Sequence, residues 1–224
     1  MFERIKEDIR TIRERDPAAS SSAQVLFLYS GLRAVILYRI AHKLYKWRRF
    51  FLARYVSQRA RHKTGIEIHP GAQIGRGLFI DHGMGVVIGE TTVIGDFCTI
   101  YQNVTLGGTG KDTGKRHPTL GNNVMVGAGA KVLGPVTIGD NAKIAAGAVV
   151  LRDVPAGATA VGIPARLVVR EKRTAKVDLD QVNIPDPVAI ELNRLKARIE
   201  ALERASSTSS GEAASITDDE TFKS

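Results

Sequence analysis

The chain has 224 residues, of which 43% are hydrophobic and only 6% aromatic, and its formal net charge is +9 at pH 7. This length is typical of one or two domains, and the single cysteine, Cys98, excludes an internal disulfide framework and favours a reducing compartment. No apolar stretch approaches the ~20 residues of a membrane span, and the acid-rich start does not resemble a signal peptide. We therefore expect a cytoplasmic protein that does not enter a membrane.

Helical segments are predicted for the N-terminal region, residues 1–63. Apolar residues at helical spacing predict a helix over residues 2–15, which Asp16-Pro17 ends. Two further amphipathic helices are predicted over about 22–47 and 50–62.

Charge is concentrated in this region. From Pro17 to Ile66 the chain carries ten Lys or Arg and no acid, with aromatic residues interleaved. Such a segment suits nucleic acid or an anionic membrane, or it is a solvated helix face above buried aromatics. Because no nucleic-acid motif accompanies the charge, we adopt the solvated face and expect neither nucleic acid nor membrane as a partner.

From Gly65 to about Val161 an aliphatic residue returns every six positions. A short fixed period indicates stacked units, here hexapeptides that each supply one short strand and one turn of a parallel β-helix. The predicted fold is therefore mainly β, with a β-helix domain over residues 64–168, α-helices before it and a helix and tail after it. The inward positions are Ile68, Ile74, Ile80, Ile88, Ile94, Ile100, Leu106, Leu120, Val126, Val132, Ile138, Ile144 and Val150.

The end of the chain differs in composition from the repeats. Residues 169–204 are predicted to be a linker and a C-terminal helix, in which Val188, Leu192, Leu195, Ile199 and Leu202 form a short heptad seam. Two heptads are marginal alone, so the seam is expected to need a partner. Residues 205–224 are rich in Ser, Thr, Ala and acids and are predicted to be disordered.

Two breaks in the six-residue period each contain a histidine. The spacing widens to eight between Ile80 and Ile88, around His82, and to fourteen between Leu106 and Leu120, where residues 107–119 form a loop containing His117. Insertions in a solenoid become loops on a rigid scaffold, where function concentrates. These histidines are therefore the candidate site, in preference to solvated surface side chains.

A neutral imidazole is suited to taking a proton from an alcohol at pH 7, and a carboxylate beside it strengthens it as a base. Glu67 is a candidate for that carboxylate, because a coil of roughly eighteen residues would bring it alongside His82. The alternative is an exposed rung residue. A metal site would need three converging ligands, and His69, His82 and His117 fit no compact zinc spacing, so no metal is expected.

Several runs of the sequence carry a resemblance to a known family. They are Arg13–Ala18, Glu67–Ala72, Ile80–Thr91, Val104–Gly110, Lys115–Pro118 and Val161–Arg166. Together they closely resemble the serine O-acetyltransferases of the hexapeptide-repeat acyltransferases, over roughly residues 5–168. The period alone would imply only a left-handed β-helix acyltransferase or a relative, whereas the signatures at Asp16-Pro17, His82 and Arg116-His117 are specific to the serine enzymes.

The resemblance implies transfer of an acetyl group from acetyl-CoA to the hydroxyl of L-serine, as a step of cysteine biosynthesis. His82 would be the general base that takes the hydroxyl proton, and Glu67, where the family often has Asp, would orient it. His117 would bind the substrate hydroxyl and assist the tetrahedral oxyanion. Since no nucleophile is placed to form an acyl-enzyme, direct transfer in a ternary complex is favoured.

The resemblance also assigns the charged ends of the substrate. Asp16 and Asp81 would hold the α-amino group, and the fork of Arg116 would pair with the carboxylate. The same groups would recognise L-cysteine, which is therefore expected to be a feedback inhibitor.

Acetyl-CoA is expected as a co-substrate, with no permanently bound cofactor. It would lie in a groove between adjacent subunits, with Lys or Arg near the last coils taking phosphate. Its backbone contacts are expected at Gly107, Gly108, Gly127, Ala128, Ala145 and Ala146.

The family implies a homotrimer whose sites are each shared by two subunits, and the seam from Val188 to Leu202 is expected to support it as a three-stranded coil. The chain lacks most of the N-terminal helical domain that pairs trimers in longer relatives, so a trimer is expected and a dimer of trimers stays open. Cysteine synthase is a partner of many relatives through a C-terminal isoleucine, whereas this sequence ends Thr221-Phe222-Lys223-Ser224.

Three other functions remain open at this point. A sugar or antibiotic O-acetyltransferase would share the fold, but a hexose offers nothing to Asp16 and Arg116. A γ-type carbonic anhydrase would require zinc. A non-catalytic scaffold with a basic docking helix would not bind acetyl-CoA.

Overall fold

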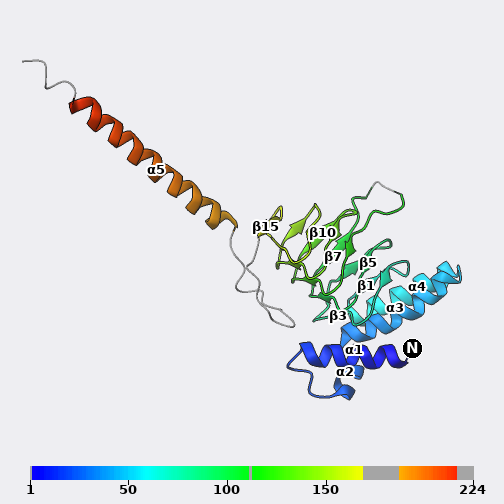
Figure 1. Cartoon of the computed structure of the whole chain (residues 1–224). Coiled ribbons are helices and arrows are strands. Elements are labelled where there is room, and N and C mark those ends of the chain that lie inside the picture. Colours follow the sequence, from blue (N-terminus) through cyan, green and yellow to red (C-terminus); the bar gives the residue numbers. More distant parts are fainter. Residues whose placement is uncertain (1, 111–112, 169–186, 216–224) are drawn as a thin grey trace, which may run out of the picture. The chain divides into compact units, whose positions relative to one another are not determined.

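A computed structural model describes residues 2–110, 113–168 and 187–215 of the chain. The chain divides into two units, Met1–Ile184 and Pro185–Ser224, and each is described by itself. The first unit holds the N-terminal helices and the predicted β-helix (Figure 1).

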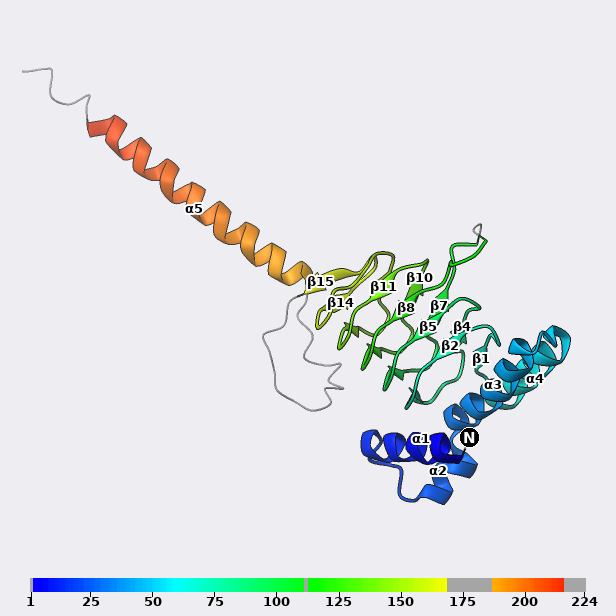
Figure 2. The same ribbon diagram turned by 45° about the vertical axis from the view of Figure 1, so that its right-hand side comes forward.

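The first unit is built around short parallel strands that stack into three sheets. Sheet A has the order β1-β4-β7-β10-β13, sheet B the order β11-β8-β5-β2, and sheet C the order β15-β14-β12-β9-β6-β3. From β1 to β13 successive strands of the chain lie in the three sheets in turn, so each complete coil contributes one strand to each sheet. Figure 2 shows β2, β5, β8 and β11 stacked side by side. The strands are β1 (Glu67–Ile68), β2 (Gln73–Ile74), β3 (Phe79–Ile80), β4 (Val87–Ile88), β5 (Val93–Ile94), β6 (Thr99–Ile100), β7 (Thr105–Gly107), β8 (Thr119–Leu120), β9 (Met125–Val126), β10 (Lys131–Leu133), β11 (Thr137–Ile138), β12 (Lys143–Ile144), β13 (Val149–Val150), β14 (Thr159–Val161) and β15 (Arg166–Val168).

The predicted inward column is confirmed by the strand register. Ile88 pairs with Leu106, Ile94 with Leu120 and Ile100 with Val126, so aliphatic residues lie directly above one another. All thirteen predicted inward residues are buried or, for Ile74, partly buried against the same core. Burial of this continuous apolar column is the main term that stabilises the stack.

Helices cover the first coil of the β-helix (Figure 1). They are α1 (Phe2–Arg15), α2 (Ser22–Leu28), α3 (Ser30–Lys46) and α4 (Phe50–Thr64), and α3 and α4 contact β1 while α1 and α3 contact β3. The approach of α3 is close at Gly31, where a Cβ atom would lie 2.1 Å from the carbonyl oxygen of Ile80. The unpaired edge of the first coil is thereby covered.

The helical region predicted over about residues 22–47 is present as two helices, because Tyr29 divides it into α2 and α3. Tyr29 has an extended backbone, with φ −78° and ψ 111°, and its hydroxyl donates to Asp16 Oδ2 at 2.6 Å. This long-range contact holds the break, which local propensity does not show. No helix among the described residues is by itself long and apolar enough to cross a membrane; α2 and α3, bent by 65°, meet that test only as a pair.

At the other end of the β-helix, the edge of sheet C is closed by a strand. β15 pairs with β14 antiparallel, with Ala160 level with Leu167, whereas the pairings between the coils before it are parallel. The edge strand of sheet C at this end is therefore antiparallel to the other strands of that sheet.

The second unit contains α5 (Pro187–Ser215). The side chains of the predicted seam, Val188, Leu192, Leu195, Ile199 and Leu202, are between 46% and 64% exposed. Disorder was predicted from residue 205, whereas the helix continues to Ser215. Residues 216–224, and with them the C-terminal sequence discussed above, lie outside the described residues.

Candidate active site

One group of predicted site residues lies at the corner between sheets C and A, which we call the His82 corner (residues 81–86). His82 follows β3, has a positive φ of 57°, and its side chain is 76% exposed. Its Nε2 atom is 3.8 Å from Asp81 Oδ1. The short turn around Gly83 thus presents the imidazole of His82 to solvent, next to a carboxylate.

Asp16 lies close enough to Asp81 at this corner for its charge to act on the Asp81 carboxyl. Asp16 accepts hydrogen bonds from the Tyr29 hydroxyl at 2.6 Å and from the Ala18 N–H at 2.8 Å. Burial raises the pKa of Asp81 above its usual value, and the charge of Asp16 raises it further. Burial, the hydrogen bond to Asp16 and the charges of both aspartates raise the pKa of Tyr29 to about 12. This negative site is suited to an ammonium group, which would relieve the repulsion between the two carboxylates.

Glu67 lies at the same corner but contacts other side chains. It is level with Val87 in the next coil, and its carboxylate pairs with Arg54 and Arg61 of α4, at 3.8 and 3.4 Å. Among the described residues, the ion-pair contact of His82 is with Asp81 and not with Glu67. Because Glu67 is level with Val87, its partner in the next coil comes five residues after His82 in the chain.

A second group lies at the corner between sheets A and B, which we call the Arg116 corner (residues 89–92 and 107–118). Arg116 Nη2 pairs with Glu90 Oε2 at 2.5 Å, and Glu90 Oε1 accepts a hydrogen bond from the Tyr45 hydroxyl at 3.1 Å. The hydrogen bond from Arg116 lowers the pKa of Glu90. The guanidinium of Arg116 is 29% exposed, so it is held in place and still accessible to an anion.

His117 is largely enclosed in this corner, with 9% exposure. The Thr91 N–H donates to His117 Nδ1 at 3.2 Å, and the Thr91 hydroxyl oxygen is 2.9 Å from the same nitrogen. Burial lowers the pKa of His117, and the positive charge of Arg116 lowers it further. His117 is therefore a neutral imidazole at pH 7.

Within one chain the structure does not bring the two groups together. The His82 corner follows β3 of sheet C, whereas the Arg116 corner follows β4 and β7 of sheet A, so the width of sheet A separates them. Asp16, Asp81 and His82 form one half of the predicted site, and Arg116 and His117 form the other. A small substrate can contact both halves only if they come from different copies of the chain.

The small residues predicted to contact acetyl-CoA are divided in the same way. Gly107 and Gly108 belong to the Arg116 corner, where a Cβ on Gly108 would lie 3.4 Å from His117 Nε2. The other four follow β9 and β12 at the corner between sheets C and A, on adjacent coils: Gly127, Ala128, Ala145 and Ala146. The Gly147 N–H donates to the carbonyl of Ala128 at 2.8 Å, which joins these coils.

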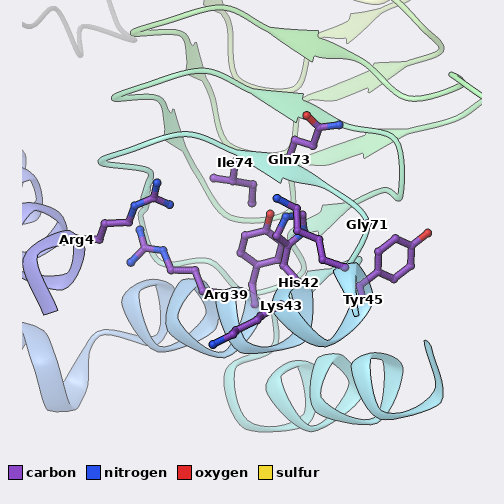
Figure 3. A pocket seen from close by; sticks show the side chains of 10 residues that line it. Arg4, Arg39, His42, Lys43, Tyr45, Gly71, Gln73 and Ile74 are labelled. Atoms are coloured by element: carbon purple, nitrogen blue, oxygen red, sulfur yellow. The ribbon is translucent and has the colours of Figure 1, made fainter. Parts of the chain in front are cut away.

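A cavity of about 780 Å³ lies elsewhere, between α3 and the turn before β2 (Figure 3). The cationic side chains of Arg4, Arg39, Lys43 and Lys46 line it, and none of the predicted site residues does. Arg39 is neutralised by the buried carboxylate of Asp8 through two hydrogen bonds of 2.5 and 3.0 Å. Part of the basic N-terminal segment thus faces this cavity.

Sequence reasoning missed three polar residues that organise the site: Tyr29, Glu90 and Thr91. Glu90 and Thr91 lie in the run Ile80–Thr91, which carries part of the family resemblance. Their place in that run could have indicated that they belong to the site. Tyr29 lies in an otherwise amphipathic helical segment and carries no such signal. Among the described residues no group of three or more His, Cys, Asp or Glu side chains is arranged to hold a metal ion.

Comparison with known sequences gives a consistent result. A family model described as "Bacterial transferase hexapeptide (six repeats)" matches residues 117–152. The chain is 55% identical over 203 residues to a serine acetyltransferase of Bacillus licheniformis, covering 91% of this chain and 94% of the relative.

Solved structures agree with the sequence matches. A serine acetyltransferase of Neisseria gonorrhoeae in complex with serine is 44% identical, with a TM-score of 0.73, over 75% of this chain and 69% of that one. A serine acetyltransferase in complex with cysteine is 44% identical, with a TM-score of 0.78, over 81% of this chain and 71% of that one. These matches confirm the left-handed parallel β-helix that the sequence predicted.

Proposed function

The chain belongs to the serine acetyltransferase family and is a serine O-acetyltransferase, and from this premise we propose how its residues carry out the reaction. The observation that carries the proposal is the division of the charged groups between two corners. The Asp16 and Asp81 carboxylates suit the α-ammonium group of L-serine, and Arg116 suits its carboxylate. A sugar would leave both charged groups without a partner.

Each site is formed by two copies of the chain, the His82 corner of one and the Arg116 corner of the next. The assembly is a homotrimer, because a head-to-tail contact between two different surface patches closes into a ring when the rotation allows it. The exposed apolar seam of α5 supports this assembly as a three-stranded coil, since 46–64% exposure of five apolar side chains at heptad spacing is typical of a helix that pairs with copies of itself.

The acetyl donor is acetyl-CoA, bound as a co-substrate along the small residues of the two corners. His82 accepts the proton of the serine hydroxyl as the oxygen attacks the thioester carbonyl carbon. Glu67, one coil away at the same corner, orients His82 once the neighbouring subunit covers the imidazole. When the tetrahedral intermediate collapses, the carbon–sulfur bond breaks and His82 returns the proton to the departing thiolate.

His117 donates a hydrogen bond to the oxygen that becomes negatively charged. A neutral imidazole is suited to this task because its N–H can donate without a change of protonation state. L-Cysteine, which has the same charged ends as L-serine, competes for the same groups. A relative has been solved in complex with cysteine, which supports this proposal.

Release of free thiol from acetyl-CoA in the presence of L-serine tests the proposal. L-Serine should support turnover, whereas L-homoserine, glycerol and hexoses should not, because they do not place a hydroxyl at the correct distance from both charged ends. Equal turnover with a hexose would contradict the roles of Asp81 and Arg116. O-Acetylserine should be the only acetylated product.

A further inference from the structure

We propose that Thr91 is a positioning residue for the acetyl transfer, which holds His117 as the tautomer that carries its proton on Nε2. The proposal rests on the proposed function, in which His117 is a hydrogen-bond donor to the oxyanion. It extends that function to a residue that does not itself contact substrate.

The contacts of the Thr91 hydroxyl determine which of its hydrogen bonds it accepts and which it donates. Its hydroxyl oxygen accepts from the backbone N–H of Arg116 at 3.0 Å and from the backbone N–H of His117 at 3.1 Å. A hydroxyl oxygen has two acceptor positions and one proton, so with both positions filled the proton must be donated elsewhere. The acceptor within reach is His117 Nδ1, 2.9 Å away.

The backbone of Thr91 leads to the same result independently. Its N–H donates to His117 Nδ1 at 3.2 Å, and a backbone N–H cannot reverse its role. Since Nδ1 accepts hydrogen bonds from both groups, it carries no proton in the neutral ring. The proton of the neutral imidazole must therefore be on Nε2.

The ring of His117 is also held sterically. A Cβ atom on Gly89 would lie 1.9 Å from Cδ2 and 2.2 Å from Nε2 of the imidazole, so the ring packs directly on the backbone of β4's exit turn. No side chain or backbone group among the described residues accepts a hydrogen bond from Nε2. The donor that Thr91 creates is thus left available at the Arg116 corner.

The opposite tautomer would harm catalysis in two ways. A proton on Nδ1 would point at the N–H and the hydroxyl proton of Thr91, so neither hydrogen bond could form. The lone pair on Nε2 would repel a developing negative charge. One well-placed donor to an oxyanion is worth ~10²- to 10³-fold in turnover. Thr91 also bonds to the backbone of Arg116, so a single hydroxyl fixes both substrate-binding residues of this corner.

The first test needs no variant. The protein labelled with ¹⁵N-histidine is studied by NMR, and His117 is assigned as the signal that disappears in His117→Gln. The proposal predicts a neutral ring at pH 7 with a protonated Nε2 and an unprotonated Nδ1. A protonated Nδ1, or a mixture of tautomers, overturns it.

The second test compares Thr91→Val with Thr91→Ser. Valine keeps the shape and removes the hydroxyl, and serine keeps the hydroxyl. We expect Thr91→Val to lower kcat by ~10- to 100-fold, as for other residues that orient a functional histidine, and to leave the KM for acetyl-CoA within about twofold. Thr91→Ser should restore kcat to within about threefold of the parent. Equal kcat in the valine and serine variants overturns the proposal.

The two tests separate this inference from the proposed function. If His117→Gln retains full turnover, the donor role of His117 is wrong, and the NMR result still decides whether Thr91 fixes the tautomer. If Thr91→Val does not fold, as judged by its melting transition, the tautomer in the unmodified protein and the activity of Thr91→Ser still decide the proposal.

Discussion

Arg116 and Glu90 form an ion pair of 2.5 Å within the chain, and the Tyr45 hydroxyl donates a hydrogen bond to the other oxygen of Glu90. The guanidinium is therefore oriented in advance, with further N–H groups left for a substrate carboxylate. Orientation in advance reduces the entropy that is lost when the substrate binds.

Arg116→Lys tests this arrangement. Lysine keeps the positive charge but loses the planar fork, so it cannot bond to Glu90 and to a carboxylate in the same geometry. We expect the KM for L-serine to rise ~10-fold or more, with the KM for acetyl-CoA unchanged. Arg76→Lys, in an exposed pair with Asp96, is the matched control and should change neither value. A serine KM equal to that of the parent would contradict the role of Arg116.

His82→Ala and Arg116→Ala together test whether the site is shared between subunits. Each variant alone should lose ~10²- to 10⁴-fold in turnover, as expected when a general base or a substrate-orienting group is removed. Unfolding and refolding the two variants as a mixture should restore activity to about a quarter of the parent, because in a head-to-tail ring one site in four then combines two intact halves. His62→Ala, at an exposed position of α4, is the control for the histidine variant. No recovery on mixing would contradict the shared site.

Asp81→Asn should stabilise the substrate-free protein while weakening serine binding. Burial raises the pKa of Asp81, so its ionised form is less favourable in the folded state than in the unfolded chain. A carboxyl whose pKa is raised on folding destabilises the fold above that pKa, and the cost disappears as the pH falls through it. The variant should therefore have the higher Tm at pH 7, and the difference should shrink toward pH 4.

The serine KM of Asp81→Asn should rise ~10-fold or more, because an ammonium group loses a charged acceptor. For the parent, the KM should rise on acidification as Asp81 becomes protonated, and the variant should lack this dependence. Glu14→Gln, at an exposed position of α1, controls for loss of one negative charge. A lower Tm for Asp81→Asn at pH 7 would show that the carboxylate stabilises the fold instead.

Cys98 should be unreactive in the folded protein. Its side chain is fully buried in the core of the β-helix, and burial raises the pKa of the thiol to about 11. Because the thiolate is the reactive form, a thiol reagent at pH 8 should modify the native chain only as fast as it unfolds. One thiol per chain should react at once in denaturant. Rapid modification of native protein would contradict its interpretation as a packing residue.

Much of the β-helix could be predicted because its information is local. The inward position of Ile88 or Ile144 follows from the six-residue period alone, and both are buried as predicted. The two breaks in that period correctly located the loops of His82 and His117. Each coil carries the same hexapeptide pattern, so the predicted fold does not depend on the correct interpretation of any one repeat.

Contacts between coils could not be predicted in this way. Whether Thr91 meets His117 depends on how the loop of residues 107–119 folds back on an earlier coil. Glu67 was placed one coil from His82 by counting residues, but its ion pairs with Arg54 and Arg61 arise from the packing of α4. The break at Tyr29 likewise depends on Asp16, which lies on another segment.

The reversed direction of β15 limits how copies of this chain can associate. An open parallel edge would accept the first coil of another molecule, and repeated addition would produce a growing fibril. Helices obstruct that route at the beginning of the solenoid, and at its end an oppositely directed strand obstructs it along the edge of sheet C. Stacking of coils end to end is therefore disfavoured, which leaves the lateral faces of the β-helix for the association proposed above.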